Sequence, residues 1–90
     1  MLQSISITVE GLVQGVFYRQ STKAKAIESG ITGEIKNKHD GTVLIIATGT
    51  EPQLEELIQW CNKGPEMAIV TAVKVEKIPL RTFRGFSIVR

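Results

Sequence analysis

The stretch Gly11-Leu12-Val13-Gln14-Gly15-Val16-Phe17-Tyr18-Arg19 decides how the first half of this chain folds. It follows residues 4–10, in which apolar and polar side chains alternate as they do in a strand with one buried face. It precedes residues 19–29, which are mostly good helix formers and are followed by Gly30, a residue that commonly ends a helix. The sequence therefore predicts a strand, a tight turn and a helix in direct succession.

This turn has the features of an anion-binding loop. Glycine at positions 11 and 15 permits backbone angles that let consecutive N–H groups converge on one point. The start of the helix adds unpaired N–H groups, and Arg19 adds a planar fork that matches phosphate or carboxylate oxygens. Because glycine-rich turns before helices are common, the pattern alone is equally consistent with an ordinary turn and a solvated arginine.

Length and composition limit the class of protein. Residues 1–90 are expected to form a single domain, because this length suffices for one two-layer core. The longest apolar run is far shorter than the roughly 20 residues of a membrane-spanning helix. No secretory signal is visible and Cys61 is the only cysteine, so we expect a cytoplasmic protein. The net charge of +2 is spread along the chain and is weak support for nucleic-acid binding.

The middle of the chain predicts a hairpin and a second helix. Residues 32–38 and 42–48 flank His39-Asp40-Gly41, and an Asp-Gly pair between two strand-like runs favours a hairpin. Thr50 is expected to cap a helix, because acidic and proline residues follow it and a glutamine lies three positions later. The apolar face of this helix is then predicted by a stripe at helical spacing, Leu54, Leu57, Ile58 and Cys61.

The predicted order of elements identifies a fold class. Residues 69–77 are rich in valine and predict a fourth strand, and residues 86–89 predict a short fifth. The order strand, helix, strand, strand, helix, strand is that of an α+β ferredoxin-like split βαβ sandwich. We therefore expect two helices on one face of an antiparallel sheet of four to five strands.

Two segments together resemble the acylphosphatase family. The segment Gly11-x-Val-Gln-Gly-Val-x-Tyr-Arg19 is similar to that family's substrate-binding loop. The segment Gly33-x-x-Lys-Asn-x-x-x-Gly-x-Val-x-x-x-x-x-Gly49 resembles the family's second signature with its spacing intact. The similarity extends to Gly64-Pro65 and to Phe86-Ser87-Ile88, so it covers essentially the whole chain.

The resemblance implies an activity and a set of site residues. It implies metal-independent hydrolysis of small acyl phosphates to a carboxylate and inorganic phosphate, without a cofactor. Arg19 would anchor the phosphoryl group, and Asn37 would orient the attacking water, which a neutral amide can hold but cannot deprotonate. The substrate-binding residues implied with Arg19, mainly through their backbone N–H groups, are Gly15, Val16, Phe17 and Tyr18.

The chain departs from the family's usual pattern near the asparagine. Glu34 stands where an aromatic residue is usual, Ile35 where a smaller one is more usual, and Lys38 where some relatives carry a small hydroxyl residue. None of these departures removes a predicted catalytic group. The sequence leaves open their effect on rate, and it does not identify the physiological acyl phosphate.

The remaining distinctive side chains are interpreted as structural. Val13, Val16 and Phe17 are expected to pack or to shape the turn rather than to take part in the chemistry through their side chains. His39 is expected to be a solvated turn residue, because no second histidine or cysteine is available to share a metal with it. Cys61 lies on the apolar face of the second helix and is expected to be a buried thiol.

Two alternative functions remain open at the level of sequence. A ferredoxin-like RNA-binding module would need aromatic residues on the central strands, and residues 4–10 and 42–48 contain none. A regulatory or accessory domain would keep the loop without turnover, as acylphosphatase-like domains do within larger proteins. We favour a monomer that acts on a small acyl phosphate and binds neither nucleic acid nor a membrane.

Overall fold

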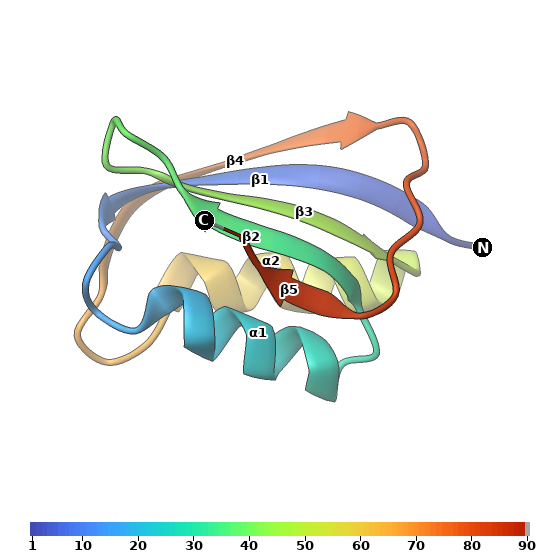
Figure 1. The fold of residues 1–90 in the computed structure, drawn as a ribbon, viewed down its shortest axis with the longest axis horizontal. Helices are drawn as coiled ribbons and strands as arrows, with labels where there is room; N and C mark the ends of the chain where they lie inside the picture. The colour runs from blue at the N-terminus through green and yellow to red at the C-terminus, as the bar shows by residue number, and fades with distance from the viewer. Residues whose placement is uncertain (90) are drawn as a thin grey trace.

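The alternating apolar residues of β1 (Gln3–Leu12) lie on the face of a five-stranded sheet that packs against two helices. The computed structural model describes residues 1–89, and Figure 1 shows both helices beneath the sheet. The other elements are α1 (Tyr18–Glu28), β2 (Thr32–Asn37), β3 (Val43–Gly49), α2 (Glu51–Lys63), β4 (Ile69–Ile78) and β5 (Phe86–Ile88). All predicted elements are present, and the α+β ferredoxin-like class is confirmed.

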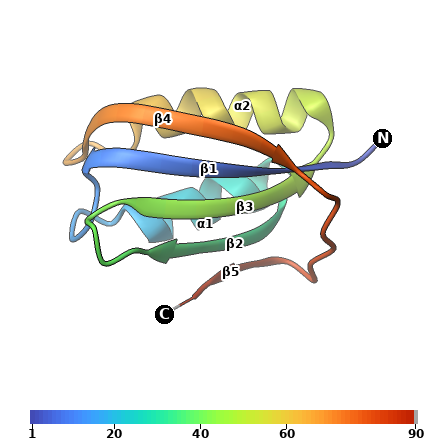
Figure 2. The same ribbon diagram turned by 90° about the horizontal axis from the view of Figure 1, so that it is seen from above.

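The sheet has the strand order β4-β1-β3-β2-β5 (Figure 2). The pairs β1–β3, β1–β4 and β2–β3 are antiparallel, as predicted. The pair β2–β5 is parallel, so the sheet is mixed and the prediction of a purely antiparallel sheet is wrong for this strand. The reason is that residues 79–85 carry the chain from one edge of the sheet to the other, and β5 then enters from the end at which β2 begins.

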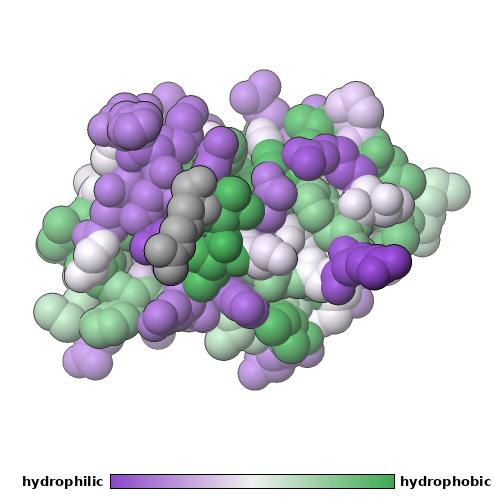
Figure 3. Space-filling view, in the orientation of Figure 1, coloured by the Kyte–Doolittle hydropathy of each residue, from purple (hydrophilic) through white to green (hydrophobic). Residues whose placement is uncertain are grey.

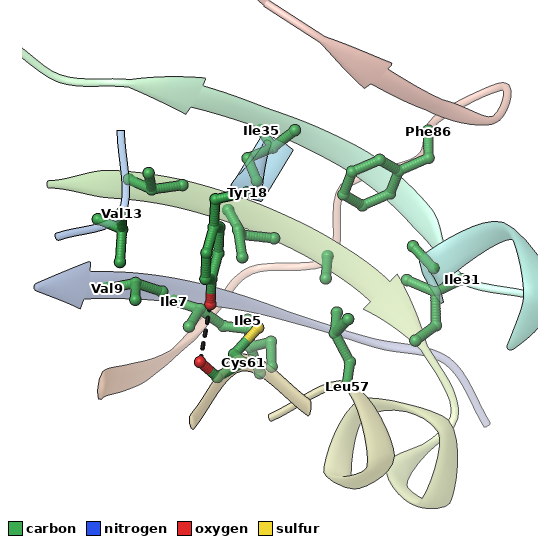
Figure 4. Packing of buried hydrophobic residues seen from close by; sticks show 14 of the residues in the cluster. Ile5, Ile7, Val9, Val13, Tyr18, Ile31, Ile35, Leu57, Cys61 and Phe86 are labelled. Atoms are coloured by element: carbon green, nitrogen blue, oxygen red, sulfur yellow. Dashed lines mark hydrogen bonds between the residues drawn. The ribbon is translucent and has the colours of Figure 1, made fainter. Parts of the chain in front are cut away.

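The core lies between the sheet and the helices. Ile7 and Val9 of β1 and Leu57 and Cys61 of α2 are fully buried there (Figure 4). Each large aliphatic side chain so buried contributes about 1.5–3 kcal/mol relative to exposure. The buried thiol predicted at Cys61 is confirmed, and burial raises its pKa to about 12. The ends of the strands are therefore attached to a well-packed core.

Local hydrogen bonds fix the start of α2 and the β2–β3 turn. The Thr50 N–H donates to Gln53 Oε1 at 2.8 Å and the Gln53 N–H donates to Thr50 Oγ1 at 3.4 Å, which is the predicted capping box. In the hairpin turn, Asp40 Oδ1 accepts from the N–H and the hydroxyl of Thr42 at 3.0 and 2.7 Å. These two bonds hold the pKa of Asp40 below its ordinary value.

The open face of the sheet does not resemble a base-stacking surface. The β1 and β3 residues on this face are hydroxyl, aliphatic and acidic side chains rather than aromatic ones. Ser4 and Thr48 are buried beneath the β4–β5 connection, where the Arg81 N–H donates to Ser4 Oγ at 2.9 Å and Thr48 Oγ1 donates to Arg81 O at 2.7 Å. No helix within residues 1–89 is long and apolar enough to cross a membrane.

Candidate active site

The β1–α1 loop and the β2–β3 turn lie at the same end of the sheet, at the left of Figures 1 and 2. The strand register explains why, since both Val9 near the end of β1 and Asn37 at the end of β2 pair with Val43. Side chains of directly paired residues share a face of the sheet, and Val9 and Val43 are buried under the helices. Asn37 therefore points toward the helical side, where the loop runs.

The sequence-predicted residues meet in one open pocket of about 620 Å³. Arg19 from the first turn of α1 and Asn37 from β2 both line it, although they come from separate signatures. The full lining is Val13, Gly15, Phe17, Tyr18, Arg19, Gln20, Asn37 and Ile88, so Val16 is the one predicted binding residue that does not line it. Figure 3 shows hydrophilic side chains gathered over the neighbouring β2–β3 turn, at the upper left.

The loop backbone exposes the start of α1. Gly15 has φ 74°, and Phe17, the N-cap of α1, has φ 63° and ψ 21°, which is left-handed. That conformation costs a bulky L-residue roughly 1–2 kcal/mol, and successive turns of this kind direct N–H groups into a common concavity. No side chain caps the helix and no acidic residue lies in its first turn. The free N–H groups and the positive end of the helix dipole therefore face the pocket.

Tyr18 anchors this loop in the core. Its side chain is buried, and its hydroxyl donates to the Cys61 carbonyl at 2.8 Å (Figure 4). Its ring also packs on Trp60, with the ring centroids 5.6 Å apart. Burial raises the pKa of Tyr18 well above its ordinary value, so the hydroxyl stays protonated. Tyr18 therefore offers the pocket its backbone rather than an ionisable hydroxyl.

The valines and the phenylalanine of the loop behave differently. Val13 and Val16 are buried, as predicted for residues that pack beneath the turn. Phe17 is 68% exposed, so of the two roles expected for it, packing and shaping the turn, it takes the second. Its left-handed backbone makes Phe17 the N-cap of α1, so its own peptide forms part of the turn.

Arg19 and Asn37, which come from the two signatures, have few protein partners in the pocket. Asn37 Oδ1 is shielded from solvent and has no hydrogen-bond partner within residues 1–89. A buried polar atom without a partner carries a desolvation cost of about 1–3 kcal/mol, which a bound water or ligand would offset. The salt bridges found among residues 1–89 do not involve Arg19, which is partly exposed. The pocket thus offers a cation and an unpaired amide oxygen to one bound molecule.

Gln14 is a contact residue that the sequence did not reveal. Its side-chain Nε2 donates to the carbonyl oxygens of Lys38 and Thr42 at 2.8 and 2.9 Å. Gln14 stands inside the quoted loop, but its partners lie 24 and 28 positions away. Only the strand register brings them together, so no local pattern could have identified this contact.

The described residues contain no cluster suited to a metal ion. Within residues 1–89, no three His, Cys, Asp or Glu side chains come together. His39 is exposed in the β2–β3 turn, as predicted for a solvated residue.

Comparison with known proteins agrees with this arrangement. A curated acylphosphatase from Marinobacter nauticus is 48% identical over 73 residues, which are 81% of this chain and 79% of that protein. The structure of an acylphosphatase from Coxiella burnetii superposes with a TM-score of 0.95 at 36% identity, covering 98% of this chain and 93% of the other. An acylphosphatase structure from Bacillus subtilis gives the same TM-score at 34% identity, with both chains covered completely.

The family model described as Acylphosphatase matches residues 5–88, which include both signatures and every residue that lines the pocket. Sequence, fold and pocket therefore lead to one assignment, and the chain belongs to the acylphosphatase family of enzymes.

Proposed function

We propose that this chain hydrolyses small acyl phosphates without a metal ion, using Arg19 to anchor the phosphoryl group and Asn37 to orient water. The observation that carries the proposal is that these two side chains line one pocket beside the open start of α1. In the reaction, a water oxygen forms a bond to phosphorus while the bond from phosphorus to the acyl oxygen breaks. An acyl phosphate dianion and water thus give a carboxylate and dihydrogen phosphate.

The loop provides the positive charge that this reaction needs. In phosphoryl transfer the negative charge spreads over three equatorial oxygens, so catalysis consists mainly of positioning and charge stabilisation. The Arg19 guanidinium can bond two of those oxygens in parallel, and the N–H groups around residues 15–19 can surround the others. Because the left-handed turn at Phe17 already holds this backbone, little reorganisation is needed when substrate binds.

Asn37 is suited to hold the attacking water. Its shielded and unpaired Oδ1 can accept a hydrogen from that water. The amide is neutral and does not remove a proton, so the water must attack with little help from a base. The chemistry permits this, because a carboxylate is a good leaving group and the bond to phosphorus breaks early in a loose transition state.

A turnover assay in chelator tests this function. Purified protein with EDTA should release phosphate from acetyl phosphate. Arg19→Ala should lose both turnover and inhibition by inorganic phosphate, because it removes the anchor. Asn37→Ala should lose roughly 10²–10³-fold in kcat, as when one oriented donor is removed from an active site, while phosphate still inhibits it.

Two variants serve as matched controls. Arg84→Ala removes an exposed arginine outside the pocket, and Asn62→Ala removes an exposed asparagine of α2. Both should retain wild-type kinetics. Phosphate binding without turnover in the wild-type protein would contradict the proposal and favour an accessory binding domain. Turnover that requires an added divalent cation would contradict metal independence alone.

A further inference from the structure

We propose that Gln14 is a positioning residue, which holds Asn37 in place relative to the β1–α1 loop, the loop that would bind phosphate. This inference rests on the proposed function and adds to it a residue that need not touch the substrate. Its basis is a two-point contact between the loop and the β2–β3 turn, made by a single side-chain nitrogen.

The geometry of the contact is specific. Gln14 Nε2 has two hydrogens, and it donates one to Lys38 O at 2.8 Å and one to Thr42 O at 2.9 Å. The same two carbonyls also close the turn, since Lys38 N donates to Thr42 O at 2.9 Å and Gly41 N donates to Lys38 O at 3.2 Å. Gln14 therefore occupies the second acceptor position of each carbonyl, and both of its hydrogen bonds depend on the conformation of the turn.

This contact has no substitute elsewhere in the described chain. Among residues 1–89, no other side-chain hydrogen bond joins the loop of residues 11–17 to residues 37–42. Lys38 follows Asn37 directly, so a bond to the Lys38 carbonyl fixes the peptide next to the residue that would hold water. On the loop side, Gln14 precedes Gly15, where the chain turns left-handed into the phosphate-binding segment.

Loss of Gln14 should affect the alignment of Asn37 rather than the binding of phosphate. The loop holds its own shape through buried Val13, Val16 and Tyr18, so the phosphoryl site should survive the loss of Gln14. Asn37 would then be free to shift relative to that site, and a misplacement of about 1 Å can reduce a rate on the order of 10²-fold. Loss of the amide should therefore lower kcat and leave phosphate binding nearly unchanged.

The first test is Gln14→Met, which keeps the length of the side chain and removes both donors. We expect kcat for acetyl phosphate in EDTA to fall by about 10- to 100-fold. The inhibition constant for inorganic phosphate should change by less than about threefold, which is within 1 kcal/mol. Gln59→Met, an exposed glutamine of α2 without a side-chain hydrogen bond in residues 1–89, is the matched control and should behave as wild type.

The second test is Gln14→Glu, which places an acceptor opposite two carbonyl oxygens. The ionised carboxylate repels both, so kcat at neutral pH should be at most that of Gln14→Met. When the carboxyl is protonated it regains one donor, so kcat relative to wild type should rise as the pH is lowered. Gln14→Met has no titratable group at this position and should not show this pH profile.

The outcomes separate the two proposals. An active wild type with unchanged kcat in Gln14→Met overturns the positioning role alone. Equal losses in kcat and in phosphate affinity also overturn it, because they show that the loop itself has collapsed. An inactive wild type overturns the proposed function and this role with it.

Discussion

Gly64→Ala should lower the free energy of unfolding and also weaken the binding of phosphate in the pocket. Gly64, the C-cap of α2, has φ 68° and ψ −172°, a backbone conformation that is essentially restricted to glycine. An added Cβ would lie 2.7 Å from Tyr18 Cε2 and 3.3 Å from the Ala68 Cβ. The Tyr18 ring cannot move away freely, because its hydroxyl donates to Cys61 O and the ring packs against the tilted ring of Trp60.

Backbone strain and overpacking of the Tyr18 ring together set the loss of unfolding free energy. The strained backbone costs about 1–3 kcal/mol, and overpacking of the ring adds about 1–3 kcal/mol. We therefore expect a loss near 4 kcal/mol, against a total stability of about 0.05–0.15 kcal/mol per residue for a folded domain. Because Tyr18 immediately precedes Arg19, phosphate inhibition should weaken in the same variant.

Urea denaturation followed by Trp60 fluorescence measures the loss. The matched control is Gly85→Ala, where φ is 146° but an added Cβ would meet no atom within 4 Å. Gly85→Ala carries only the strain, about 1–3 kcal/mol, and should leave phosphate inhibition unchanged. Equal losses in the two variants, or normal phosphate inhibition in Gly64→Ala, would refute the reasoning about the Tyr18 contact.

Four further outcomes are expected. Tyr18→Phe should lose about 1–2 kcal/mol of unfolding free energy, because it leaves the buried Cys61 carbonyl unpaired; an unchanged urea midpoint would contradict this. Phe17→Asn should raise the free energy of unfolding by about 0.5–1 kcal/mol, and the urea midpoint with it, since asparagine tolerates the left-handed backbone and the lost ring is exposed. Asp40, whose pKa is lowered by the bonds from Thr42, contributes stability above its unfolded-state pKa; the difference in urea stability between wild type and Asp40→Ala should vanish as the pH falls through the folded-state pKa. The Cys61 thiol should resist a thiol reagent at pH 8 in the native protein and react once urea unfolds it, whereas rapid native labelling would show that the core opens.

Local patterns were sufficient to predict most of the fold. Alternation in β1, the Asp-Gly hairpin and the Thr50 capping box each depend on neighbouring residues, so the sequence displays them directly. The strand β5 was predicted, but its parallel direction was not. That direction depends on where residues 79–85 cross the sheet, and no short-range pattern indicates this.

Some features of the site were likewise predicted from local patterns, and others were not. Arg19 and Asn37 were found through spaced signatures, and the structure brings both to one pocket. The sequence did not indicate which of its two expected roles Phe17 takes, because a left-handed phenylalanine is rare. Gln14 was missed because its partners depend on the pairing of β1, β3 and β2.

In the proposed mechanism, Asn37 directs water to phosphorus while Arg19 and the loop hold the phosphoryl group. Hydrolysis of acetyl phosphate by the wild-type protein in ¹⁸O-labelled water tests this directly, because each product can be weighed by mass spectrometry. The account predicts that one labelled oxygen enters inorganic phosphate and that acetate stays unlabelled. Label in acetate would mean that water attacks the carbonyl carbon, which would contradict the roles given to both side chains.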